Sequence, residues 1–239
     1  MKVKDARQRK EASQQFALSE RLKADNVDIA LSQTCKFLGK YSRCRPQDLS
    51  IQLVNGKIGE GTIKGTVIEL QLPTREQAIS EIKDFMGPLL EDVMGKNKNK
   101  IVEELITTLA VSIVLHEGAH GMLDSKPGSR FASDFEAVTG LPNEQGRAST
   151  LLDEGIAYAI QAIYAPNLEP VGSIAPAVKE TDKELVKQRK TLGEKLKPMI
   201  KEYIDSGKSI DTNFFEKARD AMIDMQTTGK KLARRKAKH

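Results

Sequence analysis

An apolar helical run of this chain ends in His116-Glu117-Gly118-Ala119-His120, which reads HExxH. Two of the chain's three histidines lie in these five positions. Residues i and i+4 lie on one face of an α-helix, so both imidazoles can reach a single metal ion. Glu117 follows the first histidine, where its carboxylate can act on a water bound to that ion. The spacing therefore predicts a helix that presents a metal site.

Two imidazoles leave such a site incomplete, because a catalytic zinc takes three protein ligands and keeps one position open. The only other histidine is His239, at the end of the sequence. The continuation HExxHxxGxxH, which is typical of metzincins, requires glycine at 123 and histidine at 126. The chain has Leu123 and Lys126 at these positions. A third ligand of the metzincin kind is therefore excluded.

Two adjacent acids, Asp153 and Glu154, stand within the otherwise apolar helical segment 151–158. Burial of unpaired carboxylates in such a helix is costly. A cation held between this helix and the HExxH helix would offset that cost. The two acids are therefore candidates for contact with the metal.

Together, HExxH and the downstream sequence DEGIA, residues 153–157, resemble the gluzincin metallopeptidases, the broad group that includes thermolysin-like and aminopeptidase families. In that group the glutamate of an (N/D/S)ExxA-type signature is the third zinc ligand. The resemblance implies that His116, His120 and Glu154 bind one Zn²⁺ per chain. The order of strands, helix, HExxH helix and DEG helix is also similar to a zincin core, over roughly residues 50–165.

The activity that this resemblance implies is zinc-dependent hydrolysis of peptide bonds. Glu117 would take a proton from the metal-activated water as general base and pass it to the leaving amine. The substrate would be a peptide or protein, and the lack of a GAMEN-like exopeptidase motif favours an endopeptidase. Residues 66–72 are the expected edge strand with which an extended substrate would pair.

Two supporting roles are left open by the sequence. Metal-bound histidines usually donate their second ring N–H to an acceptor, and Asp153 and Asp124 are the nearest candidates along the chain. For each, the alternative is a surface or capping acid. Asp124 lies one turn beyond His120, so it can share the ligand face.

The group that would stabilise the transition state is also open, because the chain has no histidine to spare for it. Tyr158 lies four residues after Glu154 and is one candidate, with an ordinary core position as the alternative. Tyr203 and Arg147 are further candidates. This gap favours a second function, a catalytically weak or inactive zincin that serves as a protein-interaction module. The intact Glu117 argues against that alternative.

The hydrophobic periodicity predicts an α+β fold, mostly helical, with a small antiparallel sheet before the HExxH helix, and the resemblance implies that this fold is zincin-like. Alternation over 51–58 and 62–72 predicts two or three antiparallel strands, with turn residues at 55–56 and 59–61. Helices are predicted over 6–23, 27–38, 75–94, 101–123, 131–138, 147–163, 181–204 and 213–225. The predicted organisation is a helical segment at 1–48, a catalytic core at 49–165, a second helical segment at 166–228 and a basic tail at 229–239.

The basic character of the chain comes mainly from its last ten residues. The apolar share of 39% and the charged share of 30% fit a helix-rich globular protein rather than a disordered one. The net charge is +5, and removing the six Lys and Arg of residues 230–239 leaves −1 for the rest. The tail has no interleaved aromatics, so a solvated end is favoured over a nucleic-acid-binding arm.

Compartment, thiol state and oligomeric state are not determined by the sequence. No segment reaches the about 18 apolar residues that a membrane span requires. The charged start, residues 1–10, has no apolar core of a signal peptide. A cytoplasmic protein and the mature form of an exported one both stay open. Cys35 and Cys44 are close enough for a local disulfide, or they are two unpaired thiols, and their spacing excludes a CxxC metal site.

Overall fold

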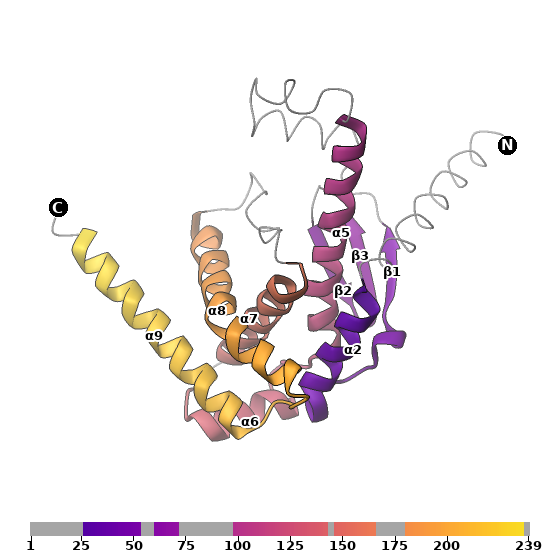
Figure 1. Cartoon of the computed structure of the whole chain (residues 1–239). Helices are drawn as coiled ribbons and strands as arrows, with labels where there is room; N and C mark the ends of the chain where they lie inside the picture. The colour runs from indigo at the N-terminus through magenta and orange to yellow at the C-terminus, as the bar shows by residue number, and fades with distance from the viewer. Residues whose placement is uncertain (1–25, 54–59, 72–97, 143–145, 166–179, 237–239) are drawn as a thin grey trace, which may run out of the picture.

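The computed structural model describes residues 26–53, 60–71, 98–142, 146–165 and 180–236. Within these ranges the chain is mostly helical with one small sheet, so the expected α+β class is confirmed. Figure 1 shows the long helix α5 lying along the sheet, with α7, α8 and α9 following on the side away from it. The helices predicted at 6–23 and 75–94, and the turn at 55–56, lie outside the described residues.

The sheet is mixed rather than antiparallel, which corrects the prediction. Its strands are β1 (Ser50–Leu53), β2 (Glu60–Lys64) and β3 (Val67–Gln71), in the order β1-β3-β2. β2 and β3 form an antiparallel hairpin, but β1 pairs with β3 in parallel, with Ser50 opposite Val67. The strand predicted over 66–72 is therefore the centre of the described sheet, and not its edge.

A tight turn at Gly65 and Thr66 divides the segment that alternates over 62–72 into two strands. Gly65 has φ of 66°, which a residue without a side chain adopts at little cost. A two-residue hairpin turn preserves the alternation of side chains across it. The hydrophobic period alone therefore does not reveal the turn.

The HExxH helix and its neighbours agree closely with the predicted ranges. α2 spans Val27–Leu38, α5 spans Lys98–Met122, α6 spans Arg130–Thr139 and α7 spans Arg147–Tyr164. Two short 3₁₀ helices, η1 (Gly39–Tyr41) and η2 (Pro46–Asp48), link α2 to the sheet. α6 begins where the Ser129 hydroxyl accepts a hydrogen bond from the Ala132 amide, an ordinary N-cap.

Of the last two helices, α8 agrees with its predicted range and α9 is longer than predicted. α8 spans Glu180–Asp205, as predicted within a residue or two. α9 spans Thr212–Lys236 and continues well beyond the expected end at residue 225. Most of the basic segment 229–239 is thus helical, as far as Lys236.

One buried apolar core joins the sheet with helices α2 and α5 to α9. It extends from α2, with Phe37, through α5 and α7 to α9, with Phe214 and Phe215. None of the described helices is both long enough and apolar enough to cross a membrane. The packing of α5 between the sheet and α7 leaves the HExxH face directed at α7, and this arrangement places the site.

Candidate metal centre

The two histidines of the motif and Glu154 of α7 converge on one point. His116 Nε2 and His120 Nε2 lie 3.2 Å apart, one turn from each other on α5. Glu154 Oε2 approaches them from α7, at 3.9 Å from His116 Nε2 and 3.8 Å from His120 Nε2. Among the described residues these three side chains form the one His, Cys, Asp or Glu group whose ligand atoms all lie within 4.8 Å of one another.

This arrangement fits a tetrahedral metal ion. With bonds of about 2.0–2.2 Å, the ligand atoms of tetrahedral zinc are separated by about 3.3–3.6 Å. The separation of 3.2 Å between the two imidazole nitrogens already matches this spacing. The carboxylate oxygen needs to move by only a few tenths of an ångström. Two nitrogens and one oxygen also leave a fourth position open for water or substrate.

Two glycines in and after the motif allow α5 to pack closely against its neighbours. A Cβ atom at Gly118 would lie 2.7 Å from Leu31 Cδ2 of α2. A Cβ atom at Gly121 would collide with Ile63 of β2 and lie 3.0 Å from a methyl of Leu49. The motif helix is therefore held against the sheet on one face while it presents its histidines on another.

Arg43 binds the carboxyl end of the same helix. Its Nε donates to the Gly121 carbonyl at 2.7 Å and a second guanidinium nitrogen to the His120 carbonyl at 3.3 Å. The Arg43 amide also donates to the Met122 carbonyl at 2.8 Å. Carbonyls in the last turn of a helix have no partner within it, and a cation there is favoured by the helix dipole. Arg43 thus stabilises the turn that carries His120.

The sequence left Asp153 and Asp124 as candidate acceptors for a histidine ring N–H, and Asp153 is the one that contacts His120. Its Oδ1 lies 2.9 Å from His120 Nδ1, and its Oδ2 accepts a hydrogen bond from the Ser125 hydroxyl. Asp153 is only 7% exposed. α5 ends at Met122, so Asp124 lies beyond the helix, where its carboxylate accepts from the Lys126 amide at 3.4 Å. The expectation that Asp124 shares the ligand face was wrong, because the helix does not continue to it.

A buried amide stands near the other histidine. Gln161 of α7 is 3% exposed, and its Nε2 donates to the Ser112 hydroxyl of α5 at 2.5 Å. His116 Nδ1 is buried and has no hydrogen-bond partner of ordinary geometry among the described residues. Burial, with further contributions from His120 and Arg189, lowers the pKa of His116 well below its usual value, while Gln161 acts in the opposite direction. His116 is therefore neutral, as a metal ligand must be.

Arg189 of α8 also contacts the ligand group, and sequence reasoning missed it. Its guanidinium lies 2.8 Å from Glu154 Oε1, the oxygen that does not face the histidines. The side chain of Arg189 is 27% exposed, so part of the guanidinium faces solvent. No motif surrounds it, and α8 joins the site only through tertiary packing. The sequence indicated only that Arg189 is a cationic residue in the helix predicted over 181–204, which follows the helix with Asp153 and Glu154.

The second motif residue, Glu117, has a raised pKa that suits a general base. Burial raises its pKa to about 7; His120 opposes this rise, and Glu154 and Asp153 add to it. A carboxylate with a pKa near neutrality accepts and releases a proton readily at physiological pH. His120 differs from His116, because burial would lower its pKa but Asp153, Glu154 and Glu117 outweigh burial and raise it to about 9.

The three residues considered as stabilisers of the transition state lie in different parts of the structure. The Tyr158 ring packs edge-on against the His116 ring, with centroids 4.6 Å apart. Tyr203 lies instead in the core, where its ring contacts Phe37 and its hydroxyl donates to Asp211 at 2.8 Å. Arg147 is exposed in the first turn of α7. Of these candidates, the structure brings only Tyr158 to the histidines.

The cysteines lie at the end of α2 and in the segment that follows it, and both are free thiols. Cys44 Sγ contacts the Gly121 carbonyl at 3.4 Å, close to the Arg43 contacts. Cys35 Sγ lies 3.4 Å from the Ser42 hydroxyl oxygen. Neither thiol belongs to the group of metal-ligand atoms.

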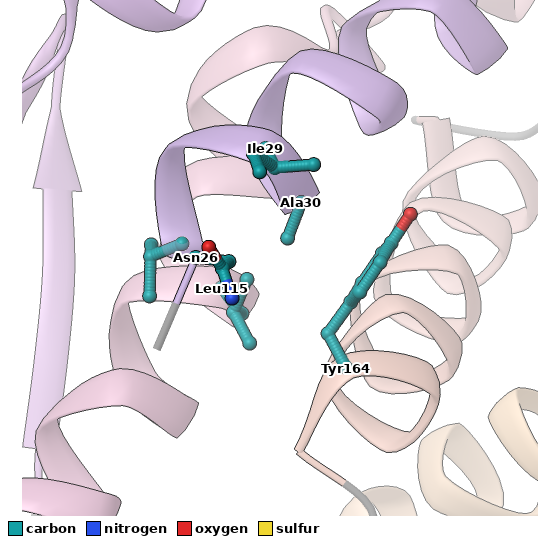
Figure 2. A pocket seen from close by; sticks show the side chains of 6 residues that line it. Asn26, Ile29, Ala30, Leu115 and Tyr164 are labelled. Atoms are coloured by element: carbon teal, nitrogen blue, oxygen red, sulfur yellow. The ribbon is translucent and has the colours of Figure 1, made fainter. Parts of the chain in front are cut away.

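A cavity of about 360 Å³ opens between residues of α2, α5 and α7. Figure 2 shows Leu115 of α5, Ile29 and Ala30 of α2 and Tyr164 of α7 around it; Asn26 and Val27 complete the lining. The Tyr164 hydroxyl donates to Gln33 Oε1 at 2.7 Å, which ties α7 to α2 at its rim. None of the metal-ligand residues lines this cavity.

Comparison with family models, with curated proteins and with solved structures found no match to this chain.

Proposed function

We propose that this protein is a zinc-dependent peptidase in which His116, His120 and Glu154 bind one metal ion. The observation that carries the proposal is the convergence of two imidazole nitrogens and a carboxylate oxygen within 4.8 Å. Glu117, on the same helix and with a pKa raised to about 7, supplies a base beside them. A structural zinc site usually has four protein ligands and needs no such base.

A bound zinc ion would supply a Lewis acid that polarises the scissile carbonyl and lowers the pKa of an attacking water to about 7. Glu117 then acts as the general base that accepts the proton and returns it to the departing amine. Its carboxylate is suited to both steps, because burial brings its pKa close to the pH at which both occur. Asp153 holds the His120 ring, since its Oδ1 lies 2.9 Å from His120 Nδ1.

Arg189 places a permanent positive charge beside the ligand group. One of its nitrogens holds Glu154 Oε1 at 2.8 Å, which leaves Oε2 for the metal. A guanidinium has five N–H donors, so the others are available to a carbonyl oxygen on which negative charge develops. Tyr158, packed on the His116 ring, is the second group that could donate to that oxygen.

The substrate that fits this site is an extended peptide. Because β3 is central in the described sheet, an incoming strand would add to an edge, and β2 is the edge strand packed on the motif helix through Ile63. Addition of a peptide to a sheet edge uses backbone hydrogen bonds and tolerates many side chains. This mode of binding favours cleavage within a chain over recognition of its terminus.

The test compares wild-type protein with Glu117→Gln in a zinc analysis and a quenched-fluorescent peptide library. Wild type should hold one zinc per chain and cleave peptides in a chelator-sensitive manner, while Glu117→Gln should hold zinc and lose turnover. Glu104→Gln, an exposed position on α5, is the matched control and should retain activity. Stoichiometric zinc without any cleavage by wild type would instead support a zincin that serves as a protein-interaction module.

A further inference from the structure

The two histidines of the motif are supported differently at their second ring nitrogen. His120 Nδ1 faces the Asp153 carboxylate at 2.9 Å. His116 Nδ1 is buried and has no hydrogen-bond partner of ordinary geometry in the described part of the chain. If His116 Nε2 binds a metal, its Nδ1 carries the proton and needs an acceptor. A buried N–H without one is costly.

The Gln161 amide is the polar group placed to meet this need. Its Nε2 donates to Ser112 Oγ, and Ser112 precedes His116 by one turn on the same face of α5. The bond therefore anchors the amide beside the His116 ring. Because Ser112 engages the Nε2 of this amide, its oxygen is the atom left to accept. Both Gln161 and Ser112 are buried, at 3% and 0% exposure, so water does not readily take their place.

We propose that Gln161 is a positioning residue of the metal site, whose Oε1 accepts the Nδ1–H of His116. This inference rests on the proposed function, since it assumes that His116 Nε2 binds the metal. Ser112 fixes the amide orientation, the amide fixes the tautomer and tilt of the ring, and the ring presents Nε2 to the ion. A neutral amide leaves His116 without the proton-attracting carboxylate that acts on His120.

The experiment is a zinc competition titration with a chromophoric chelator, on the full chain. Gln161→Met preserves the shape of the side chain but removes the acceptor, and it should weaken zinc binding by about 10- to 100-fold. Gln161→Glu restores an acceptor oxygen and should bind zinc at least as tightly as wild type. The cobalt(II) absorption spectrum of Gln161→Met should change in band position or intensity, because a tilted ring alters the ligand field.

A control substitution in the core distinguishes a positioning role of Gln161 from a purely structural one. Thr34→Val removes a buried hydroxyl on α2 that donates to the Ala30 carbonyl. It should lower the Tm of the chelator-treated protein while leaving the zinc Kd unchanged. If Gln161→Met does not fold, Ser112→Ala carries the test, and it should weaken zinc binding by a smaller factor, about 3- to 10-fold.

The role of Gln161 is overturned if Gln161→Met binds zinc with an unchanged Kd, or if Ser112→Ala does so when Gln161→Met does not fold. In that case zinc binding by the wild type leaves the proposed function intact. Absence of zinc binding by wild type overturns both. A weakened Kd that Gln161→Glu restores supports the positioning role.

Discussion

Asp153 Oδ1 lies 2.9 Å from His120 Nδ1, while the next residue, Glu154, reaches the other nitrogen of that ring at 3.8 Å. Two consecutive carboxylates of α7 thus face opposite ends of one imidazole. Asp153 contacts Nδ1 of the ring, and Glu154 lies beside Nε2, the nitrogen proposed to bind the metal. Burial of both acids in α7 is tolerable because each has a partner. Asp153 contacts His120 and Ser125, and Glu154 pairs with Arg189.

Replacing Asp153 should change both the proton affinity and the metal affinity of His120. Asp153 is the largest of the groups that raise the pKa of His120 to about 9 against its burial. In chelator-treated Asp153→Ala the pKa of His120, followed by NMR, should fall toward or below its ordinary value near 6.5. Zinc binding should weaken by about 10- to 100-fold. A His120 pKa that stays near 9 would show that Asp153 does not hold the ring.

The stability of the metal-free protein should depend on pH through the same histidine. The folded-state pKa of about 9 exceeds the ordinary value of 6.5, so the stabilisation is complete below about pH 6.5 and is lost as pH rises through about 9. A tenfold change in proton affinity corresponds to about 1.4 kcal/mol, so the free energy of unfolding should fall by at most about 3 kcal/mol.

Urea unfolding of chelator-treated protein at pH 6, 8 and 9.5 measures this loss. Asp153→Ala is the matched control and should show a much smaller dependence. Zinc-loaded wild type should not lose stability over this range in the same way, because the ion binds the neutral ring. A metal-free protein equally stable at pH 6 and 9.5 would contradict the assignment.

Arg189 should matter for turnover more than its surface position suggests. Arg189→Met removes the charge beside Glu154 and should reduce kcat/KM by about 100-fold or more, the usual cost of losing one donor to the transition state. Zinc should stay at one per chain, and Arg189→Lys should retain part of the activity. The control is Lys187→Met, an exposed position on the same helix. Full activity in Arg189→Met, measured on the same peptide, would remove Arg189 from the mechanism.

The approach of α8 to α7 depends on Gly193. A Cβ atom there would lie 2.6 Å from Tyr158 Cβ and 3.2 Å from the Gly155 carbonyl oxygen. Gly193→Ala gains about 0.5–1 kcal/mol of helix propensity, but overpacking costs about 1–3 kcal/mol. Net destabilisation and weakened contact between Arg189 and Glu154 are therefore expected. Thermal unfolding checks this against Glu194→Ala, an exposed neighbour that should change stability by less than about 0.5 kcal/mol.

The parts of the site that the sequence could predict are those fixed by local geometry. The spacing of His116 and His120 places both rings on one helix face whatever the rest of the chain does. The adjacent acids of α7 were visible because carboxylates are rare in an apolar stripe. Arg189 and Gln161 carried no such signal. Each reaches the site through helix packing, and a buried Gln or an amphipathic Arg is common in helices without any such role.

The sheet shows where periodicity alone is insufficient. Alternation over 62–72 continues through the turn at Gly65, so the pattern does not show where one strand ends and the next begins. The parallel pairing of β1 with β3 depends on how the chain returns to the sheet, which strand composition does not encode. The edge proposed for the substrate is accordingly β2, rather than the strand at 66–72.

The central claim, that His116, His120 and Glu154 bind one zinc ion, is tested most directly by zinc K-edge X-ray absorption on the purified protein. The expected result is one zinc per chain with two imidazole nitrogens at about 2.0–2.1 Å and further light-atom ligands at about 2.0–2.2 Å. Glu154→Ala should retain the imidazole signal but bind zinc more weakly. A zinc bound through sulfur at about 2.3 Å, or no stoichiometric zinc at all, would contradict the claim.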